Sequence, residues 1–309
     1  MNPKKVVFIG MGAIGSLYAS KCSQTKSNIT CITRSDSSEI KQGGIRIIHP
    51  NGQESTWRPD QVCESIHDVE SPPDYVVIAT KVPSNQTLVT AISPIIGPNT
   101  TIVLLQNGIF IESIYQEHYP ETPIISGLAF VCVAKIAPAT IHHQDYGRLV
   151  LGLYPNGNHQ QVNDFLDLFS DAGIQCKLSS KIQFERYKKL IWNAPFNPLS
   201  VIYGGKTTQE LLANDDIKIR IKNSMKDIQL LAAYDGYTIE DDILEKNITD
   251  TQKMKPYKTS MCLDWELNRE IEIEAILGNA ITRAGQLGCQ VPTLKALYHE
   301  LSIKIKHNK

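Results

Sequence analysis

The first residues of the chain run from an apolar stretch into a glycine-rich turn and then into a helical pattern. Residues 4–9 have the composition of a buried strand. The turn that follows consists of Gly10, Met11, Gly12, Ala13, Ile14 and Gly15. In this GxGxxG pattern the first glycine permits the tight turn, the second lets the backbone approach a pyrophosphate, and the third allows close packing of helix on strand. The pattern therefore predicts a βαβ unit that holds dinucleotide phosphates at a helix N-terminus.

Arg34 directly follows a second strand, which is predicted for residues 28–33. In dinucleotide-binding domains an acidic residue near this point hydrogen-bonds the ribose 2′-hydroxyl of NAD, whereas an arginine accommodates the 2′-phosphate of NADP. Arg34 therefore favours NADP. Asp36 lies two residues further on and leaves an alternative open, because its carboxylate could serve NAD or pair with Arg34.

Strand and helix patterns alternate through the first half of the chain. Further strands are predicted at residues 45–49, 74–80, 100–105, 123–133, 148–153 and 174–178. Lys81 follows one of these strands, and Gln106, Asn107 and Gly108 follow the next. Since open α/β sheets bind ligands at the carboxyl ends of their strands, Lys81 and Asn107 are expected beside the glycine turn. Each also has a structural interpretation, Lys81 as part of a strand-to-helix connection and Asn107 as part of an Asn-Gly turn.

Helical periodicity replaces the strand patterns beyond residue 180. Apolar residues recur three or four positions apart in residues 217–231 and 271–280, and 309 residues exceed the length of one ordinary domain. The predicted fold class is therefore α/β, with an N-terminal Rossmann-type dinucleotide-binding domain at 1–179 and a mostly helical C-terminal domain at 180–309. We expect the two domains to enclose one cleft, a common place for an enzyme site.

Lys189, Asn193 and Asn197 recur at intervals of four within the second domain. On a helix they project from one face as a cation and two amides, which suits an anionic substrate rich in oxygen. Pro195 lies inside this segment and is expected to kink the helix, because proline lacks a backbone donor. Without further information, the alternative is a solvated polar face with no function.

The composition excludes several other classes of protein. A formal net charge of -1 argues against bulk binding to nucleic acid or to an anionic membrane, so a small molecule is the expected partner. The seven cysteines lack CxxC spacing, and the adjacent His142 and His143 would point to opposite faces of a strand, so no disulfide framework and no metal site are predicted. No apolar run reaches membrane-spanning length and no room precedes the first strand for a targeting segment, so we expect a cytoplasmic protein.

The order and approximate spacing of these motifs resemble the ketopantoate reductase (2-dehydropantoate 2-reductase) family across nearly the whole chain. The matching positions are the GxGxxG turn, Arg34, Lys81, Asn107, Lys189, Asn193, Asn197, Ser260 and, twelve residues beyond Ser260, Glu272. The resemblance implies a nicotinamide-binding Rossmann domain joined to a helical domain. It also implies NADPH as the cofactor and the reduction of 2-dehydropantoate to (R)-pantoate in pantothenate biosynthesis.

The resemblance further implies roles for individual residues. Lys189 matches the proton donor, and Glu272 matches a carboxylate at the cleft that orients substrate or cofactor and holds Lys189. The glycine turn, Arg34, Lys81, Asn107 and Glu272 match cofactor-binding positions. Substrate-binding positions are matched by Asn107, Lys189, Asn193, Asn197 and Ser260. By itself, Ser260 would predict only a helix cap, and Glu272 a solvated helix face that it shares with Glu266, Glu270 and Glu274.

Some departures from the family pattern affect the substrate side more than the cofactor side. Ile109 stands where the family commonly has another glycine, and residues 203–208 lack an asparagine that the family often has there. Two alternatives therefore stay open: a reductase of the same fold for another 2-keto acid or an imine, and a non-catalytic NADP-sensing protein. A homodimer is also an assembly compatible with the resemblance.

Overall fold

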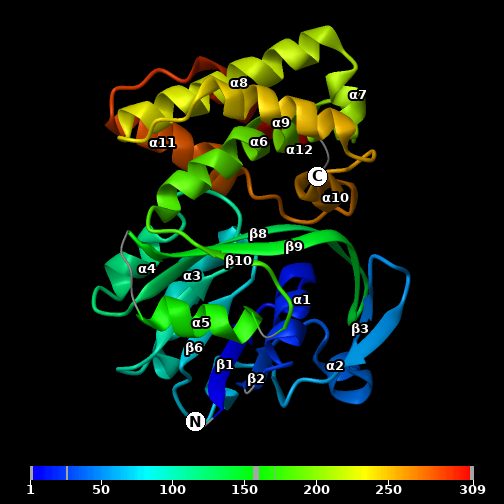
Figure 1. Cartoon of the computed structure of the whole chain (residues 1–309), viewed down its shortest axis with the longest axis vertical. Helices are drawn as coiled ribbons and strands as arrows, with labels where there is room; N and C mark the ends of the chain where they lie inside the picture. Colours follow the sequence, from blue (N-terminus) through cyan, green and yellow to red (C-terminus); the bar gives the residue numbers. More distant parts are fainter. Residues whose placement is uncertain (1–2, 26, 156–159, 171, 307–309) are drawn as a thin grey trace. The chain divides into compact units, whose positions relative to one another are not determined.

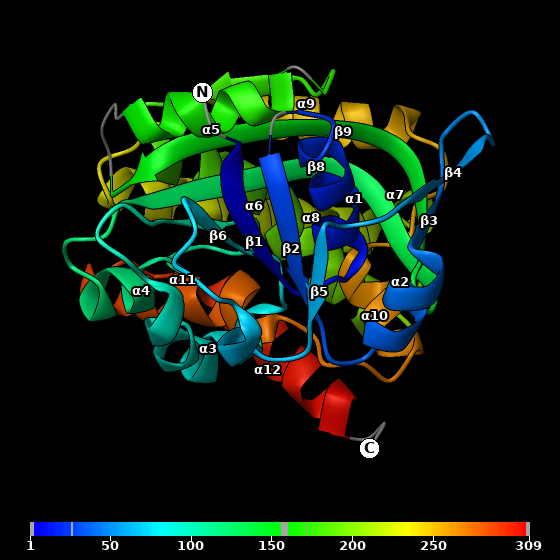
Figure 2. The ribbon, with the colours of Figure 1, turned by 90° about the horizontal axis from the view of Figure 1, so that it is seen from below.

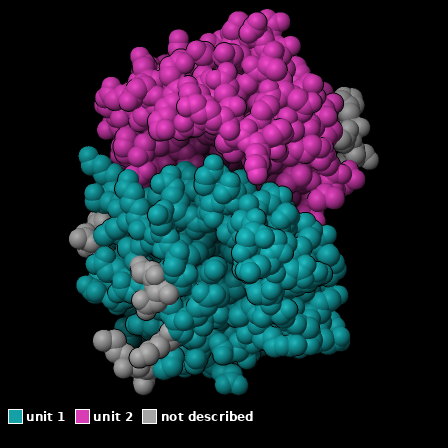
Figure 3. All heavy atoms as spheres, turned by 45° about the vertical axis from the view of Figure 1, so that its right-hand side comes forward, with its two compact units in different colours: residues 1–107, 111–182 teal, residues 108–110, 183–309 magenta. Residues whose placement is uncertain are grey.

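The chain divides into two compact units, which Figure 3 colours separately. The computed structural model describes residues 3–25, 27–155, 160–170 and 172–306. Unit 1 comprises Met1–Asn107 and Ile111–Ile182, and unit 2 comprises Gly108–Phe110 and Gln183–Lys309. The chain passes into the main part of unit 2 between Ile182 and Gln183, and the sequence-based boundary at 179 stays a prediction. The short segment Gly108–Phe110 is an addition to unit 2 that sequence did not foresee.

Unit 1 contains a mixed sheet in which ten strands are described. Their order is β4-β3-β9-β8-β7-β6-β1-β2-β5, and β10 pairs with β9. The strands are β1 (Lys4–Ile9), β2 (Ser27–Ile32), β3 (Ile45–Ile48), β4 (Glu54–Trp57), β5 (Gln61–Cys63), β6 (Tyr75–Ile78), β7 (Thr101–Leu104), β8 (Ile124–Ala137), β9 (Thr140–Tyr154) and β10 (Cys176–Leu178). Strands β7, β6, β1 and β2 are parallel neighbours. β7 and β6 are buried throughout and β1 is buried from Val6 on, which explains their apolar sequences.

The hairpin of β8 and β9 is longer than the sequence predicts. Separate strands were expected at 123–133 and 148–153, whereas the two antiparallel strands extend to Ala137 and begin again at Thr140. Three register shifts interrupt the pairing, and such irregularities break the alternation of inward and outward side chains. Figure 2 shows the pair as a long curved ribbon beside β3.

The helices of unit 1 follow the predicted strand-to-helix connections. They are α1 (Ala13–Cys22), α2 (Ser37–Gly43), α3 (Asn85–Ala91), α4 (Ser113–His118) and α5 (Gln160–Ser170). α1 packs on α5 through an edge-to-face contact of Tyr18 and Phe169, whose ring centroids lie 6.1 Å apart. Tyr75 of β6 contacts Phe165 of α5 in the same core, so α5 packs against the sheet.

Unit 2 is helical throughout its described length apart from its connections (Figure 1). Its α-helices are α6 (Ile182–Ile202), α7 (Thr208–Leu212), α8 (Asp215–Tyr234), α9 (Asp241–Lys253), α10 (Ser260–Glu266), α11 (Asn279–Gln286) and α12 (Pro292–Lys306). A π-helical turn, η4 (Glu274–Gly278), precedes α11. Gly236 and Gly288 end two of these helices, because they adopt positive φ angles of 86° and 68° just beyond α8 and α11.

Helix α6 continues through both of its prolines. The sequence predicts a kink at Pro195. The helix is assigned as one continuous span of 21 residues, which contains both Pro195 and Pro198. None of the helices that the structure describes combines the length and the apolar character needed to cross a bilayer.

Gly15 provides a test of how the first strand and helix pack. A Cβ atom at Gly15 would lie 2.0 Å from the carbonyl oxygen of Gly10, whereas a Cβ at Gly12 would meet nothing within 4 Å. Because the clash is with backbone, we expect Gly15→Ala to lower the free energy of unfolding by about 3 kcal/mol, within the usual range for overpacked cores. Gly12→Ala should unfold at the same denaturant concentration as the wild type. Equal midpoints for all three proteins in urea unfolding would contradict the close packing.

Candidate active site

Four neighbouring parallel strands bring the predicted cofactor residues to one edge of the sheet. In the register of the sheet, Ile9 lies opposite Ile32 and Ile78, and Ile78 lies opposite Leu104. The segments that leave these strands therefore emerge side by side at their carboxyl ends. These segments carry the glycine turn at residues 10–15, Arg34, Lys81 and Asn107. Unit 1 thus assembles these residues where the sequence analysis placed them.

The glycine turn has the form of a phosphate cradle. Gly10 adopts a φ angle of 94°, and a Cβ there would lie 2.7 Å from the Thr80 side chain, so only glycine fits. Gly12 borders open space and caps α1 without a side-chain hydrogen bond, and the first turn of α1 carries no acidic residue. The N-terminal N–H groups of α1 are therefore not covered by a capping side chain. This arrangement fits a pyrophosphate.

Arg34 and Asp36 lie in different environments. Arg34 is exposed, whereas Asp36 is only 3% exposed and accepts a hydrogen bond of 2.8 Å from the backbone N–H of Ala139. Asp36 also forms an ion pair with Lys135 of β8. Burial alone would raise the pKa of Asp36, but the contacts with Lys135 and Ala139 outweigh it and lower this pKa. Of the alternatives left open by sequence, the structure shows neither pairing with Arg34 nor an exposed carboxylate at Asp36.

A buried amide pair connects the segments that carry Lys81 and Asn107. Gln106 donates through Nε2 to Oδ1 of Asn85 at 2.8 Å, and Asn85 donates through Nδ2 to Oε1 of Gln106 at 3.0 Å. Gln106 Nε2 also donates to the carbonyl of Thr80 at 2.9 Å. The residue before Asn107 is thus tied to the residue before Lys81. Sequence reasoning missed Asn85, because an amide pair 21 residues apart leaves no periodic pattern.

Helix α6 presents the predicted polar row in unit 2. Asn193 and Asn197 are buried, at 6% and 4% exposure, and Lys189 is half-buried, so this face is not solvated. Near the end of the row, Ser200 Oγ donates to the carbonyl of Asn197 at 2.7 Å and lies 2.8 Å from Oγ1 of Thr259.

Ser260 follows Thr259 as the first residue of α10, which places it near the Asn197 end of the row. The predicted cap is one residue off, because Thr259, not Ser260, caps α10 by accepting a hydrogen bond from the N–H of Cys262.

Glu272 does not lie on the long acidic helix that the sequence suggested. Helix α10 ends at Glu266, and Glu272 sits in the connection before η4, with an exposure of 7%. The expectation of a solvated helix face is therefore wrong. The sequence of residues 266–274 contains no glycine or proline that would mark the end of α10. The break between α10 and η4 could therefore not be predicted from the sequence. The structure brings Glu272 into electrostatic interaction with Lys189.

Lys189 has a pKa near neutral pH. Burial lowers the pKa of its ammonium to about 7, the positive charge of Arg186 also lowers it, and the carboxylate of Glu272 raises it. An amine with such a pKa is protonated and deprotonated in comparable amounts at neutral pH. It can therefore polarise a carbonyl and then transfer a proton to its oxygen. Sequence analysis singled out Lys189 but not Arg186, which stands three residues earlier.

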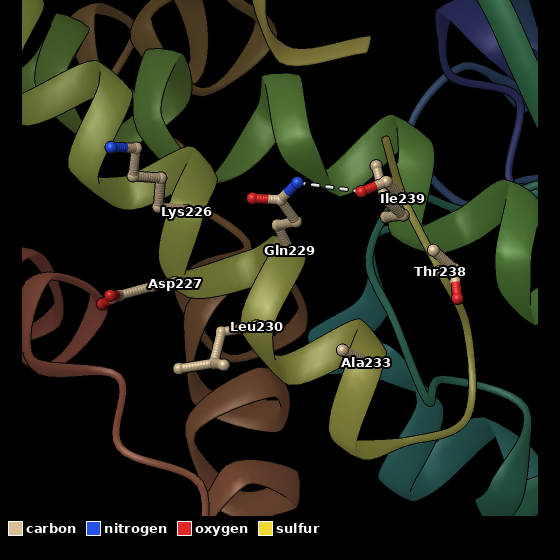
Figure 4. Close-up of a pocket in the computed structure, with 7 residues that line it drawn as sticks. All are labelled: Lys226, Asp227, Gln229, Leu230, Ala233, Thr238 and Ile239. Carbon is tan, nitrogen blue, oxygen red and sulfur yellow. Dashed lines mark hydrogen bonds between the residues drawn. The ribbon is translucent and has the colours of Figure 1, made fainter. Parts of the chain in front are cut away.

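A surface hollow of unit 2, with a volume of about 460 Å³, is shown in Figure 4. It is lined by Lys226, Asp227, Gln229, Leu230, Ala233, Thr238 and Ile239, none of which is a predicted site residue. Within the described ranges no group of three or more His, Cys, Asp or Glu side chains could hold a metal ion, and all seven cysteines are free thiols.

Comparisons with known proteins extend over the whole chain. Residues 6–156 match the family described as "Ketopantoate reductase PanE/ApbA", and residues 181–304 match its C-terminal counterpart. The chain is 33% identical to the 2-dehydropantoate 2-reductase of a Nostoc species, over 100% of this chain and 98% of that protein.

Solved structures give the same picture of the fold. The crystal structure of 2-dehydropantoate 2-reductase from Methylococcus capsulatus is 37% identical, with a TM-score of 0.91 over 99% of this chain and 98% of that one. A D-mandelate dehydrogenase, solved with NADH and anilino(oxo)acetate, has a TM-score of 0.89 at 20% identity over 98% of this chain and 99% of that one. At that identity the likeness extends to the fold alone.

Glu272→Gln tests the electrostatic contact with Lys189. Because the Glu272 carboxylate raises the pKa of Lys189, its replacement by a neutral amide should lower that pKa below about 7. The pKa can be measured by competitive acetylation of the Lys189 amine across a pH series, with peptide mass spectrometry as the readout. Glu274→Gln, two residues away, is the matched control and should leave Lys189 unchanged. A pKa of Lys189 that rises in Glu272→Gln would contradict the assignment.

Proposed function

The chain belongs to the ketopantoate reductase family of oxidoreductases, and from this premise we propose that it reduces 2-dehydropantoate to (R)-pantoate with NADPH. The observation that carries the proposal is the site of unit 2, where a lysine with a pKa of about 7 lies on one helix face with two buried amides and interacts with a buried carboxylate. Such a site suits a small anionic ketone, because it offers a cation, hydrogen-bonding amides and a proton.

NADPH is the cofactor that the residues of unit 1 support best. The open cradle at Gly12 and the uncapped N-terminus of α1 suit the pyrophosphate. The exposed Arg34 suits a 2′-phosphate, and Asp36 is engaged by Lys135 and Ala139. When bound, the nicotinamide supplies a hydride to the carbonyl carbon. Lys81, Asn107 and the other residues at the strand ends would hold the nucleotide at the carboxyl edge of the sheet.

The residues of unit 2 would handle the substrate and the proton. Lys189 attracts the substrate carboxylate, polarises the ketone and gives its proton to the carbonyl oxygen as that oxygen becomes an alkoxide. Asn193, Asn197 and Ser260 bind the polar groups of the substrate. Glu272 keeps Lys189 in place. It also orients a substrate hydroxyl or the cofactor, and in the latter role it is a cofactor-binding residue.

A second candidate is a reductase of another 2-keto acid or of an imine. The observation that favours it is the pair Ile109 and Phe110, which occupies a position where family members commonly have glycine and which belongs to unit 2 with the substrate residues. A non-catalytic NADP-sensing protein is the third candidate, and it predicts nucleotide binding without turnover.

The remaining proposals concern the setting of the enzyme. We propose that it acts in pantothenate biosynthesis in the cytoplasm, which the seven free cysteines support. A homodimer stays a prediction, and sedimentation equilibrium with purified protein would test it.

Purified protein, assayed with NADPH and a panel of 2-keto acids and imines, tests the proposed reaction. We expect 2-dehydropantoate to give a kcat/KM above about 10⁴ M⁻¹s⁻¹, a typical enzymatic value, and the other compounds to be much poorer substrates.

Lys189→Ala should lower kcat by about 10² to 10⁴, because the proton donor is lost, while NADPH still binds. The neighbouring Lys188, which pairs with Glu185, provides the control Lys188→Ala with near wild-type kcat. Better turnover of another acceptor would replace the substrate, and full activity of Lys189→Ala would end the assignment of the donor.

Arg34→Ala tests the choice of cofactor. Because a charged hydrogen bond contributes about 1.5 to 3 kcal/mol, the variant should bind NADPH roughly ten- to a hundredfold more weakly and NADH nearly as the wild type does. Isothermal titration calorimetry with both nucleotides measures the two affinities. Arg58→Ala, at an exposed arginine that donates to the carbonyl of Gln42, is the matched control. Equal losses for NADPH and NADH would show that Arg34 does not read the 2′-phosphate.

A further inference from the structure

The segment Gly108–Phe110 is bound to unit 2 by a set of backbone and side-chain contacts. Arg186 donates through Nη1 to the carbonyl of Gly108 at 2.8 Å. Ile109 donates its N–H to the carbonyl of Ala275 at 3.0 Å, and Asn279 donates through Nδ2 to the carbonyl of Ile109 at 2.8 Å. These contacts explain why three residues next to Asn107 group with the helical unit.

The backbone of this segment adopts positive φ angles, and the contacts with unit 2 maintain this conformation. Gly108 has a φ angle of 111° and Phe110 one of 56°, a left-handed conformation that is uncommon for a residue other than glycine. A Cβ at Gly108 would lie 2.7 Å from both Cβ and the carbonyl oxygen of Ala275. Phe110 in turn packs edge-on against Tyr187, with the ring centroids 6.0 Å apart. The surrounding groups therefore determine one conformation for the segment, as is usual where strained residues persist.

Arg186 connects this segment to the helix that carries Lys189. Its side chain is only 1% exposed, and it stands three residues before Lys189 on α6. At that spacing the Cβ atoms lie about 5–6 Å apart on one helix face. A buried guanidinium is costly unless it is hydrogen-bonded, and the bond to Gly108 meets part of that need. Removing Arg186 therefore affects two things at once, the charge near Lys189 and the anchor of the segment that follows Asn107.

We infer that Arg186 is a positioning residue of the reaction: it fixes the segment after Asn107 to α6, and it places a buried positive charge one helical turn from Lys189. This inference rests on the proposed role of Lys189 as proton donor. Arg186, from the same helix, and Glu272, from the connection before η4, both act on Lys189 through their charges. Their effects have opposite signs, so the proton affinity of Lys189 reflects a balance that either residue can shift.

Variants of Arg186 separate its charge from its hydrogen bond. Arg186→Gln removes the charge but keeps an N–H donor for Gly108, and Arg186→Met removes both. Arg186→Lys keeps the charge. Arg220→Gln is the matched control, because Arg220 is also partly buried in unit 2 but pairs with Glu300 and Tyr203. Circular dichroism and thermal unfolding identify which variants are folded. If one of the two charge-free variants does not fold, the other still provides the measurement.

The test measures the pKa of Lys189 by competitive acetylation and compares it with the pH profile of kcat. Without the positive charge, the pKa of Lys189 should rise by about one pH unit in Arg186→Gln and Arg186→Met, and the alkaline limb of kcat should move up with it. Arg186→Lys should restore the wild-type value, and Arg220→Gln should not alter it.

The possible outcomes distinguish this inference from the proposed function. An unchanged pKa of Lys189 in the folded charge-free variants would overturn the inference, since a merely structural role of Arg186 would move stability but not that pKa. A raised pKa with an unshifted alkaline limb would leave the influence of Arg186 on Lys189 intact and remove Lys189 as the proton donor. A parallel rise of both supports the two together.

Discussion

Burial of the Lys189 ammonium is the constraint on which the proposed chemistry of unit 2 depends. In water this group would keep its proton far above neutral pH, whereas burial brings its pKa to about 7. Burial alone would favour the neutral amine, which cannot donate. The Glu272 carboxylate opposes that effect, and its own burial before η4 makes the interaction stronger than it would be at a solvated surface. The site therefore depends on a balance of burial and charge at one nitrogen atom.

The proposed cofactor residues of unit 1 depend on a different principle, the register of parallel strands. Because β7, β6, β1 and β2 end level with one another, the segments after them emerge side by side at one edge of the sheet. The amide pair of Asn85 and Gln106 then fixes two of these segments relative to each other. In the same way, Lys135 and Ala139 of the β8–β9 hairpin hold Asp36. Sheet geometry brings the segments together, and buried hydrogen bonds orient them.

This division also separates what the sequence could predict from what it could not. The glycine turn, the buried strands and the row from Lys189 to Asn197 were predictable, because each depends on spacing within a few residues. Two polar pairs could not be predicted, that of Asp36 with Lys135 and that of Asn85 with Gln106. The members of each pair are far apart in the chain, and polar pairs leave no periodic pattern. The short elements β5 and α4 were missed for lack of length. Glu272 was misplaced because the helical period resumes only after the interruption at 267–273.

Helix α6 shows why local preference gave an incomplete view of the site. A proline inside a helix costs about 3 kcal/mol, and α6 contains two, which is more than intrinsic helix propensity can offset. Yet the helix is continuous, because Leu190, Ile191 and Phe196 are fully or almost fully buried in the core of unit 2, and each such side chain contributes roughly 1.5–3 kcal/mol. The helical geometry that aligns Asn193 with Asn197 is therefore maintained by tertiary packing. It follows that the polar row and the apolar core of unit 2 are two faces of one element, and the alignment of the first depends on the burial of the second.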